Sequence, residues 1–340
     1  MAMREDAGHT GPTMTMTARR CLRACGVLFL CVAASLAFAQ TTPARPYRIG
    51  VLNEAYAANH PTVEGLKAGL RQLGFLEGRD VNFEIRFTDG KREELATAAK
   101  ALVDGGIDVL FTCNETATLA AKNASRTIPI VFTLVGDPVA SGIVDRLIRP
   151  GSNVTGVYDA ATQLTPKRME ILRDLQPALK RVWFIYRAGD STDEAALGAV
   201  ADAARQLKLE LIPRAVDHPD QVVRFLKEVR KGDALLAPHV DELNGSVRIL
   251  ETSIKSRIPA IFPAGVWVTR GGLVSYGPNY YAQGVQAARI VAKVLQGSRP
   301  AALPVETAGD FELALNLDTA RLLGVTVPRT VLFRANVFRQ

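Results

Sequence analysis

Residues 109–156 read VLFTCNETATLAAKNASRTIPIVFTLVGDPVASGIVDRLIRPGSNVTG. An apolar strand is predicted at 109–111; it ends in a polar loop that leads into a small-residue helix at 117–125. Further strands are predicted at 130–132 and 154–158, and the first of these also ends in polar residues. Strand, polar loop, helix and strand in this order form the unit of a parallel sheet, whose ligands bind outside the carboxyl ends of the strands. The stretch predicts an α/β fold that presents a pocket.

The same alternation extends along most of the chain. Other strands are predicted at 48–52, 81–87, 181–186, 210–212, 234–237, 258–262, 273–276 and 312–317. Other helices are predicted at 61–73, 92–103, 164–175, 193–207, 220–229, 244–255, 280–295 and 318–323. Strict alternation implies right-handed crossovers and parallel sheets.

The length predicts two lobes. A chain of 340 residues is too long for one ordinary core. The Ile-Pro strand at 127–131 is echoed at 258–262, which indicates two copies of one architecture. We expect two lobes, each a parallel sheet flanked by helices, that exchange segments across a hinge near Gly156 and Gly277. The expected lobes are 45–156 plus about 278–308, and 157–277 plus about 309–340.

The N-terminus has the pattern of a secretory signal. Three arginines precede an apolar run at 24–38, and Ala37 and Ala39 are the small residues that a signal peptidase reads. We expect 1–39 to be a signal peptide, cleaved before Gln40, and the mature protein to lie in the periplasm. The alternative is a membrane anchor, but roughly fifteen apolar residues fall short of the twenty or so that span a bilayer.

The charge and the cysteine content argue against a nucleic-acid-binding protein and against a disulfide-stabilised one. Four arginines and two acids lie in 1–39, so the remainder has 37 basic and 32 acidic residues and a net charge of +5. The chain has no run of lysine and arginine of the kind that binds the phosphates of a nucleic-acid backbone, so nucleic acid is not an expected partner. Cys113 is the one cysteine outside that segment. We therefore expect no internal disulfide.

Several motifs, in one order, carry a resemblance to a known family. They are Gly65–Gly74, Ile128–Val131, Gly136–Val139, Arg149–Gly156, Lys167–Arg168, Gly271–Gly277, Leu303–Glu306, Phe311–Leu313 and Asn316–Ala320. The sequence resembles the ABC-transporter substrate-binding proteins with the type I periplasmic-binding fold, a group that includes tryptophan- and tyrosine-binding members. The resemblance implies a monomer without a cofactor that captures a small solute between its lobes. It would deliver that solute to an ABC permease and its cytoplasmic ATPase.

The loop before the 117–125 helix is a candidate ligand site. Asn114, Glu115 and Thr116 lie at a helix start, whose free N–H groups and dipole favour an anion. In the amino-acid-binding relatives this position tends to read Gly-Thr-Pro, which suits a carboxylate. Here Glu115 would compete with a bound carboxylate. The alternative is that Glu115 caps the helix and points to solvent.

Asp241 is a candidate in the second lobe. The resemblance implies that an acid near this position suits a ligand ammonium, because a charged group in a closed cleft needs a partner. Alternatively Asp241 caps the next helix, and His239 is either a pocket residue or a loop histidine. If Glu115 and Asp241 face each other, the ligand should bear an amine, an amide or several donors. An aromatic or apolar body would pack on Tyr56, and a dicarboxylate or phosphate is disfavoured.

Other polar and aromatic residues follow predicted strands. A small-solute pocket with aromatic sides would be completed by these strand-end residues: Asp137, Tyr158, Arg187, Tyr276 and Asn279. For Asp137 the alternative is a turn-tightening role.

Two other functions remain to be weighed. An enzyme could use Asp241, or Cys113 with His60 or His239, although a small buried residue is the plainer reading of Cys113. No nucleophile elbow, metal-spaced cluster or phosphate-binding loop supports catalysis, so no catalytic or metal residue is assigned. The ligand-sensing half of a repressor shares this fold, but the signal and the lack of a DNA-binding helix pair argue against it.

Overall fold

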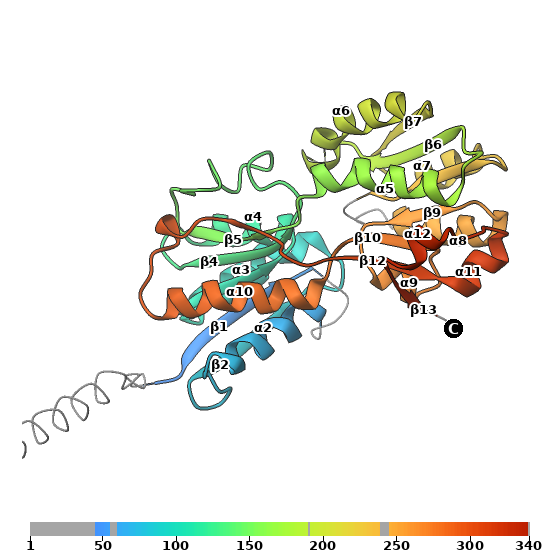
Figure 1. Ribbon diagram of the computed structural model, residues 1–340. Helices are drawn as coiled ribbons and strands as arrows, with labels where there is room; N and C mark the ends of the chain where they lie inside the picture. Colours follow the sequence, from blue (N-terminus) through green and yellow to red (C-terminus); the bar gives the residue numbers. More distant parts are fainter. Residues whose placement is uncertain (1–44, 55–59, 190, 239–244, 339–340) are drawn as a thin grey trace, which may run out of the picture. The chain divides into compact units, whose positions relative to one another are not determined.

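The computed structural model describes residues 45–54, 60–189, 191–238 and 245–338 (Figure 1). The expected signal segment therefore lies outside the described residues. None of the helices within these ranges has the length and apolar character needed to cross a membrane.

The first lobe is built on a six-stranded sheet in the order β11-β5-β4-β3-β1-β2, with every neighbouring pair parallel. Its strands are β1 (Tyr47–Asn53), β2 (Val81–Phe87), β3 (Val109–Cys113), β4 (Ile130–Val135), β5 (Val154–Tyr158) and β11 (Glu306–Thr307). Val51 and Leu52 belong to different core clusters. Because successive side chains of a strand point to opposite faces, both faces of this sheet are buried.

Helices cover both faces of this sheet. They are α2 (Pro61–Gln72), α3 (Leu95–Asp104), α4 (Glu115–Ala124) and α10 (Tyr280–Leu295), with short 3-10 turns at Arg92–Glu94 and Pro300–Ala302. Figure 1 shows α10 lying alongside α2. A Cβ on Gly65 would lie 2.0 Å from the Tyr281 carbonyl oxygen, and one on Gly284 would lie 2.0 Å from that of Thr62. Glycine is required at both positions because the helix backbones touch.

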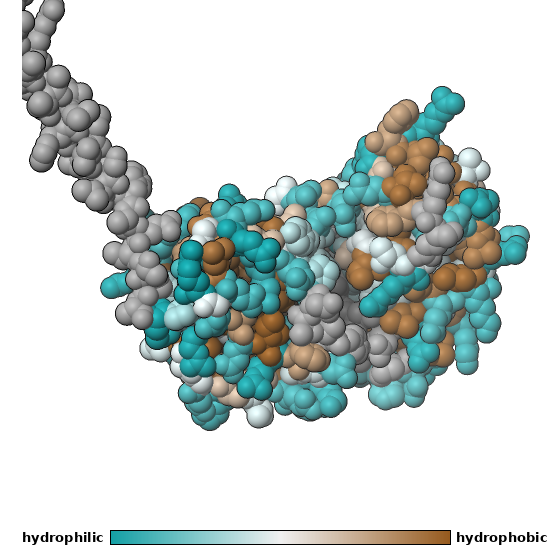
Figure 2. Space-filling model, turned by 90° about the horizontal axis from the view of Figure 1, so that it is seen from below, coloured by the Kyte–Doolittle hydropathy of each residue, from teal (hydrophilic) through white to brown (hydrophobic). Residues whose placement is uncertain are grey.

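The second lobe has a seven-stranded sheet in the order β13-β12-β10-β9-β8-β6-β7. Its strands are β6 (Arg181–Arg187), β7 (Glu210–Val216), β8 (Asp233–Leu236), β9 (Ala260–Phe262), β10 (Val274–Pro278), β12 (Phe311–Asn316) and β13 (Ala335–Phe338). Its helices are α5 (Ala161–Leu175), α6 (Ser191–Gln206), α7 (Pro219–Leu226), α8 (Gly245–Ser256), α9 (Val266–Thr269), α11 (Leu317–Leu323) and α12 (Arg329–Leu332). On the face shown in Figure 2, apolar residues reach the surface in several separate groups among hydrophilic ones.

The α/β fold with two helix-flanked, mainly parallel sheets is confirmed. Two strands at one edge of the second sheet differ from strict parallel order, since β12 runs antiparallel to β10 and β13 runs parallel to β12. The physical reason is the connection to β12: the chain leaves this sheet after β10 at Asn279 and re-enters it before β12 at Asp310, and these two residues are hydrogen-bonded, so the neighbouring strands run in opposite directions. The sequence patterns also did not predict α9, α12 and β13, which are only four residues long each.

Three segments connect the two sheets, and we call them the hinge. The first, Asp159–Ala160, leads from β5 to α5; the second, Asn279, leads from β10 to α10; the third, 308–310, leads from β11 to β12. Ala308 N–H donates to the Tyr158 carbonyl (2.9 Å), and Asn279 N–H donates to the Asp310 carbonyl (3.0 Å). The second and third hinge segments are therefore bonded to each other, and the third is also bonded to the last residue of β5.

Candidate ligand-binding site

The site begins where β3 ends and α4 starts. Asn114 has φ +87° and is the N-cap of α4, since its Oδ1 accepts from the backbone N–H of Ala117 at 2.9 Å. Asparagine caps helices well, and because φ +87° with ψ 171° is a region that residues other than glycine rarely adopt, the surrounding contacts must hold Asn114 there. Thr116 Oγ1 also lies 2.9 Å from Asn114 Oδ1. The two residues therefore form a rigid polar start to the helix.

Glu54 completes this cluster, although the sequence patterns did not single it out. Its carboxylate accepts from Asn114 Nδ2 (2.9 Å) and from the Thr116 hydroxyl, and its Oε1 lies 3.7 Å from Arg92 Nε. The residue is buried, with 8% of its surface exposed. The available signal was its position directly after β1, because β1 and β3 are neighbours in the sheet and their carboxyl ends meet at one edge.

Glu115 connects the two lobes. The Ser191 hydroxyl, at the first residue of α6, lies 3.2 Å and 3.3 Å from the two oxygens of the Glu115 carboxylate. Both residues are half-buried. Glu115 is therefore engaged with the other lobe rather than turned into solvent. Ser191 is the second residue that the sequence patterns missed, and no local motif marked it.

Three expected pocket residues, Tyr56, His239 and Asp241, lie outside the described residues. Their contribution stays a prediction. The pairing of Glu115 with Asp241 across the cleft is likewise neither supported nor opposed by the geometry.

The remaining candidates hold local structure. Asp137 Oδ1 accepts from the backbone N–H groups of Val139 (3.1 Å) and Ala140 (3.0 Å), which is the turn-tightening role. Asn279 caps α10 through the Ala282 N–H (2.9 Å), and its Nδ2 donates to Glu312 at 3.2 Å.

Three further candidates lie at strand ends. Tyr158 and Arg187 are the last residues of β5 and β6, and Tyr276 lies within β10; all three are half-buried. Tyr158 and Arg187 are thus partly accessible at the carboxyl ends of their strands, whereas Tyr276 lies two residues before the end of β10.

Cys113 has the environment of a core residue. Its exposed fraction is 1%, and burial raises the pKa of its thiol to about 12. Burial lowers the pKa of His60 to about 4, and the His60 Nδ1 accepts from the Thr62 N–H at the start of α2. A thiol with so high a pKa forms little nucleophilic thiolate. Within the described ranges no group of three or more His, Cys, Asp and Glu residues is arranged to hold a metal ion.

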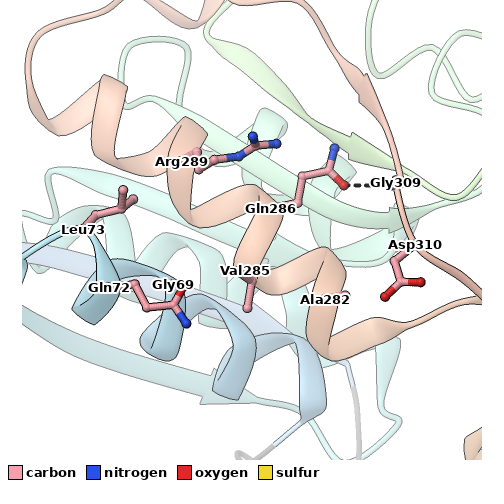
Figure 3. Close-up of a pocket in the computed structure, with 9 residues that line it drawn as sticks. All are labelled: Gly69, Gln72, Leu73, Ala282, Val285, Gln286, Arg289, Gly309 and Asp310. Carbon is pink, nitrogen blue, oxygen red and sulfur yellow. Dashed lines mark hydrogen bonds between the residues drawn. The ribbon is translucent and has the colours of Figure 1, made fainter.

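The close-up in Figure 3 shows a hollow elsewhere on the first lobe. Its volume is about 420 Å³, and it lies between α2 and α10, where Gly69 and Val285 line it beside Gly309 and Asp310 of the hinge. None of the expected pocket residues that the structure describes lines this hollow. It is distinct from the strand ends that carry the candidate site.

Comparisons with known proteins agree with this architecture. A family model described as ABC transporter substrate binding protein matches residues 55–338. A tyrosine-binding protein of Clostridioides difficile is 26% identical over 270 residues, which are 78% of each chain.

Solved structures give the same result. A conserved domain protein from Vibrio cholerae is 27% identical with a TM-score of 0.79, over 87% of this chain and 100% of the other. A Streptococcus pneumoniae ABC domain in complex with L-Trp has 24% identity and a TM-score of 0.77, over 86% and 99% of the chains; at that identity the likeness shows the fold alone. The chain belongs to the family of ABC transporter substrate-binding proteins.

Proposed function

We propose that this chain captures a small organic solute between its two lobes and hands it to an ABC permease with its ATPase. The observation that carries the proposal is the family match over residues 55–338. The position of the polar cluster supports it, since α/β sheets bind ligands at the carboxyl ends of their strands. The solute would lie near α4 and α6, whose first residues, Glu115 and Ser191, bond across the lobes.

The solute bears an amine, an amide or several hydrogen-bond donors, with an aromatic or apolar body against Tyr56. On the first lobe, the carboxylates of Glu54 and Glu115 both lie at this edge of the sheet, with Arg92 Nε 3.7 Å from Glu54 Oε1. Asn114 and Thr116 already donate to Glu54, so they are less available to a ligand carboxylate. A cationic or multi-donor group fits such an acidic wall because carboxylates accept strong, charge-assisted hydrogen bonds.

The relatives bind aromatic amino acids by name: one is a tyrosine-binding protein, and one structure holds L-Trp. An aromatic amine is therefore a fitting first class of solute to test. In the second lobe Asp241 would provide a further acid, with His239 and Arg187 at neighbouring strand ends.

The other parts of the proposal follow from the sequence. The protein is exported to the periplasm after removal of 1–39, acts as a monomer and needs no cofactor. The lobes are 45–156 with about 278–308, and 157–277 with about 309–340. They close about the hinge, and bound solute favours the closed state. No enzymatic activity is proposed, and the raised pKa of Cys113 argues against its use as a nucleophile.

The test is thermal unfolding with matched pairs of probes, namely tyramine with L-tyrosine and tryptamine with L-tryptophan. A solute that binds the folded chain raises its melting temperature with concentration, following RT ln(1 + [L]/Kd). We expect a rise with an amine-bearing probe. If neither the probes nor fractionated small molecules from the periplasm raised the melting temperature, the proposal would be refuted.

A further inference from the structure

A buried polar cluster joins the hinge segments. Gln283 of α10 donates through Nε2 to Asp159 Oδ1 at 2.6 Å and to the Val157 carbonyl at 3.3 Å. Asp159 N–H donates in turn to the Val135 carbonyl at 2.8 Å. Asp159, Gln283 and Arg168, which we call the hinge cluster, are all at most 2% exposed. The cluster thus ties the first hinge segment to the helix that begins at the second.

Arg168 brings α5 into this cluster. Its Nε donates to the Tyr276 carbonyl of β10 at 2.7 Å, and its Nη1 donates to Thr165 at 3.3 Å. It also attracts the Asp159 carboxylate electrostatically. Asp159 and Arg168 therefore approach each other where the chain passes between sheets, and a change in their interaction acts directly on the hinge.

Two buried atoms of the cluster lack a hydrogen-bond partner within the described part of the chain: the acceptor Gln283 Oε1 and the donor Arg168 Nη2. A protonated Asp159 has an O–H that can donate to the amide oxygen, so that acid and amide pair through two hydrogen bonds. An ionised Asp159 can instead accept from the guanidinium. The protonated form would thus give Gln283 Oε1 a hydrogen-bond partner, and the ionised form would give one to Arg168 Nη2. Leaving a buried polar atom unpaired destabilises the fold, so the cluster has two competing arrangements.

Other ionisable groups face this cluster from every neighbouring element. Asp193 of α6 and Tyr276 of β10 interact with Arg168, and Tyr280 of α10 interacts with both Asp159 and Arg168. Glu312 of β12 faces Tyr280, and Asp310 of the third hinge segment faces Glu312.

We propose that Asp159 is a proton-responsive switch in the hinge. Its protonated form favours the conformation described here, in which the hinge segments pack together around a neutral acid–amide pair. Its ionised form favours conformations in which these segments separate, so that water or Arg168 reaches the carboxylate. The physical cause is the cost of a buried charge, which is avoided when the group is neutral or solvated.

The Asp159 carboxyl titrates near neutral pH. Burial raises the pKa of Asp159 to about 7, and the Gln283 hydrogen bond and the Arg168 charge only partly offset it. Burial lowers the pKa of Arg168 to about 10, so the guanidinium stays charged at neutral pH. Burial also raises the pKa of Glu312, which makes that carboxyl the competing candidate.

Distance measurement between spin labels tests the proposal without any ligand. Ala101 of α3 and Ala199 of α6 are exposed and carry the labels as cysteines, while Cys113 stays buried. Cys21, Cys25 and Cys31 are replaced by serine. In the parent we expect the distance distribution between labels to change from pH 5.5 to pH 8.5 with a midpoint near pH 7. The Asp159→Asn variant should keep the low-pH distribution throughout.

Two further variants keep the test decisive. Glu312→Gln is the matched control and should retain the transition. Gln283→Met removes both hydrogen bonds of the neutral acid–amide pair, so it weakens the protonated arrangement and should move the midpoint to lower pH, a result that does not depend on Asp159→Asn folding. A parent distribution that ignores pH would overturn the proposal. So would a transition that survives Asp159→Asn or is lost in Glu312→Gln.

Discussion

The carboxyl of Asp159 also predicts how the stability of the whole fold depends on pH. Its pKa is about 7 in the folded chain against 3.8 for an ordinary aspartate, with burial as the main cause. The folded state therefore binds this proton more tightly than the unfolded state. The resulting stabilisation is largest at low pH and is lost progressively between about pH 4 and pH 7. Asparagine has nearly the same shape but no charge, so Asp159→Asn should remove this dependence.

The size of the effect follows from the shift. At about 1.4 kcal/mol per pKa unit, the ionisation penalty on folding grows by about 3 kcal/mol between pH 4.5 and pH 8. The assay is denaturant unfolding of parent and Asp159→Asn at both pH values. We expect the stability of the variant relative to the parent to rise by about 3 kcal/mol from the lower to the higher pH.

Subtracting the stability of the parent from that of Asp159→Asn at each pH cancels the contributions of the other ionisable groups. The pKa values of Asp80 and Asp108 are lowered in the folded chain, so these two carboxyls increase the free energy of unfolding as pH rises. In the parent alone their contribution would hide that of Asp159. The control is Asp202→Asn, which removes an exposed carboxylate of α6. A relative stability of Asp159→Asn that stays constant with pH would refute the buried, neutral state of this carboxyl.

Three other outcomes are expected. Glu115→Gln should weaken binding of the solute by about 1.5–3 kcal/mol, roughly ten- to a hundredfold, by calorimetry, and unchanged affinity would remove this residue from the site. Asp233→Asn should destabilise the fold by about 2–3 kcal/mol in denaturant unfolding, because the buried Asp233 accepts two hydrogen bonds from Arg181 and one from the Trp183 indole. As a control, replacing the exposed Asp202 with asparagine should change the free energy of unfolding by less than about 0.5 kcal/mol. Equal effects of the two substitutions would contradict a structural role for the buried Asp233 carboxylate. Cys113 should not react with a thiol reagent at pH 8 until the protein is unfolded; rapid labelling of the native protein would show that its thiol is accessible.

Local sequence patterns predicted most of the fold because both faces of each central strand are buried. The helix expected at 280–295 coincides with α10, since Asn279 caps its start and its apolar residues recur at helical spacing. The four-residue elements α9, α12 and β13 were not predicted. Segments so short hold too little periodicity, and packing against the sheet decides their structure.

The candidate site was less predictable because its contacts are distant in sequence. The position of Asn114 at a helix start followed from its neighbours. Its bond to Glu54 spans 60 residues, and the bond from Ser191 to Glu115 spans 76. The same holds for Asp159, whose partner Gln283 lies 124 residues further along the chain. Such pairs depend on strand order and helix packing, which local patterns do not specify.

Native mass spectrometry of protein purified from the periplasmic fraction tests the proposed function most directly. We expect a protein that begins near Gln40 and carries one small organic solute per chain. That solute should bear an amine or amide, be released unchanged when the protein is unfolded, and rebind to the refolded protein with lower affinity in Glu115→Gln. A solute that is chemically converted by the protein would contradict the account. So would a chain that binds no small molecule from the periplasmic extract.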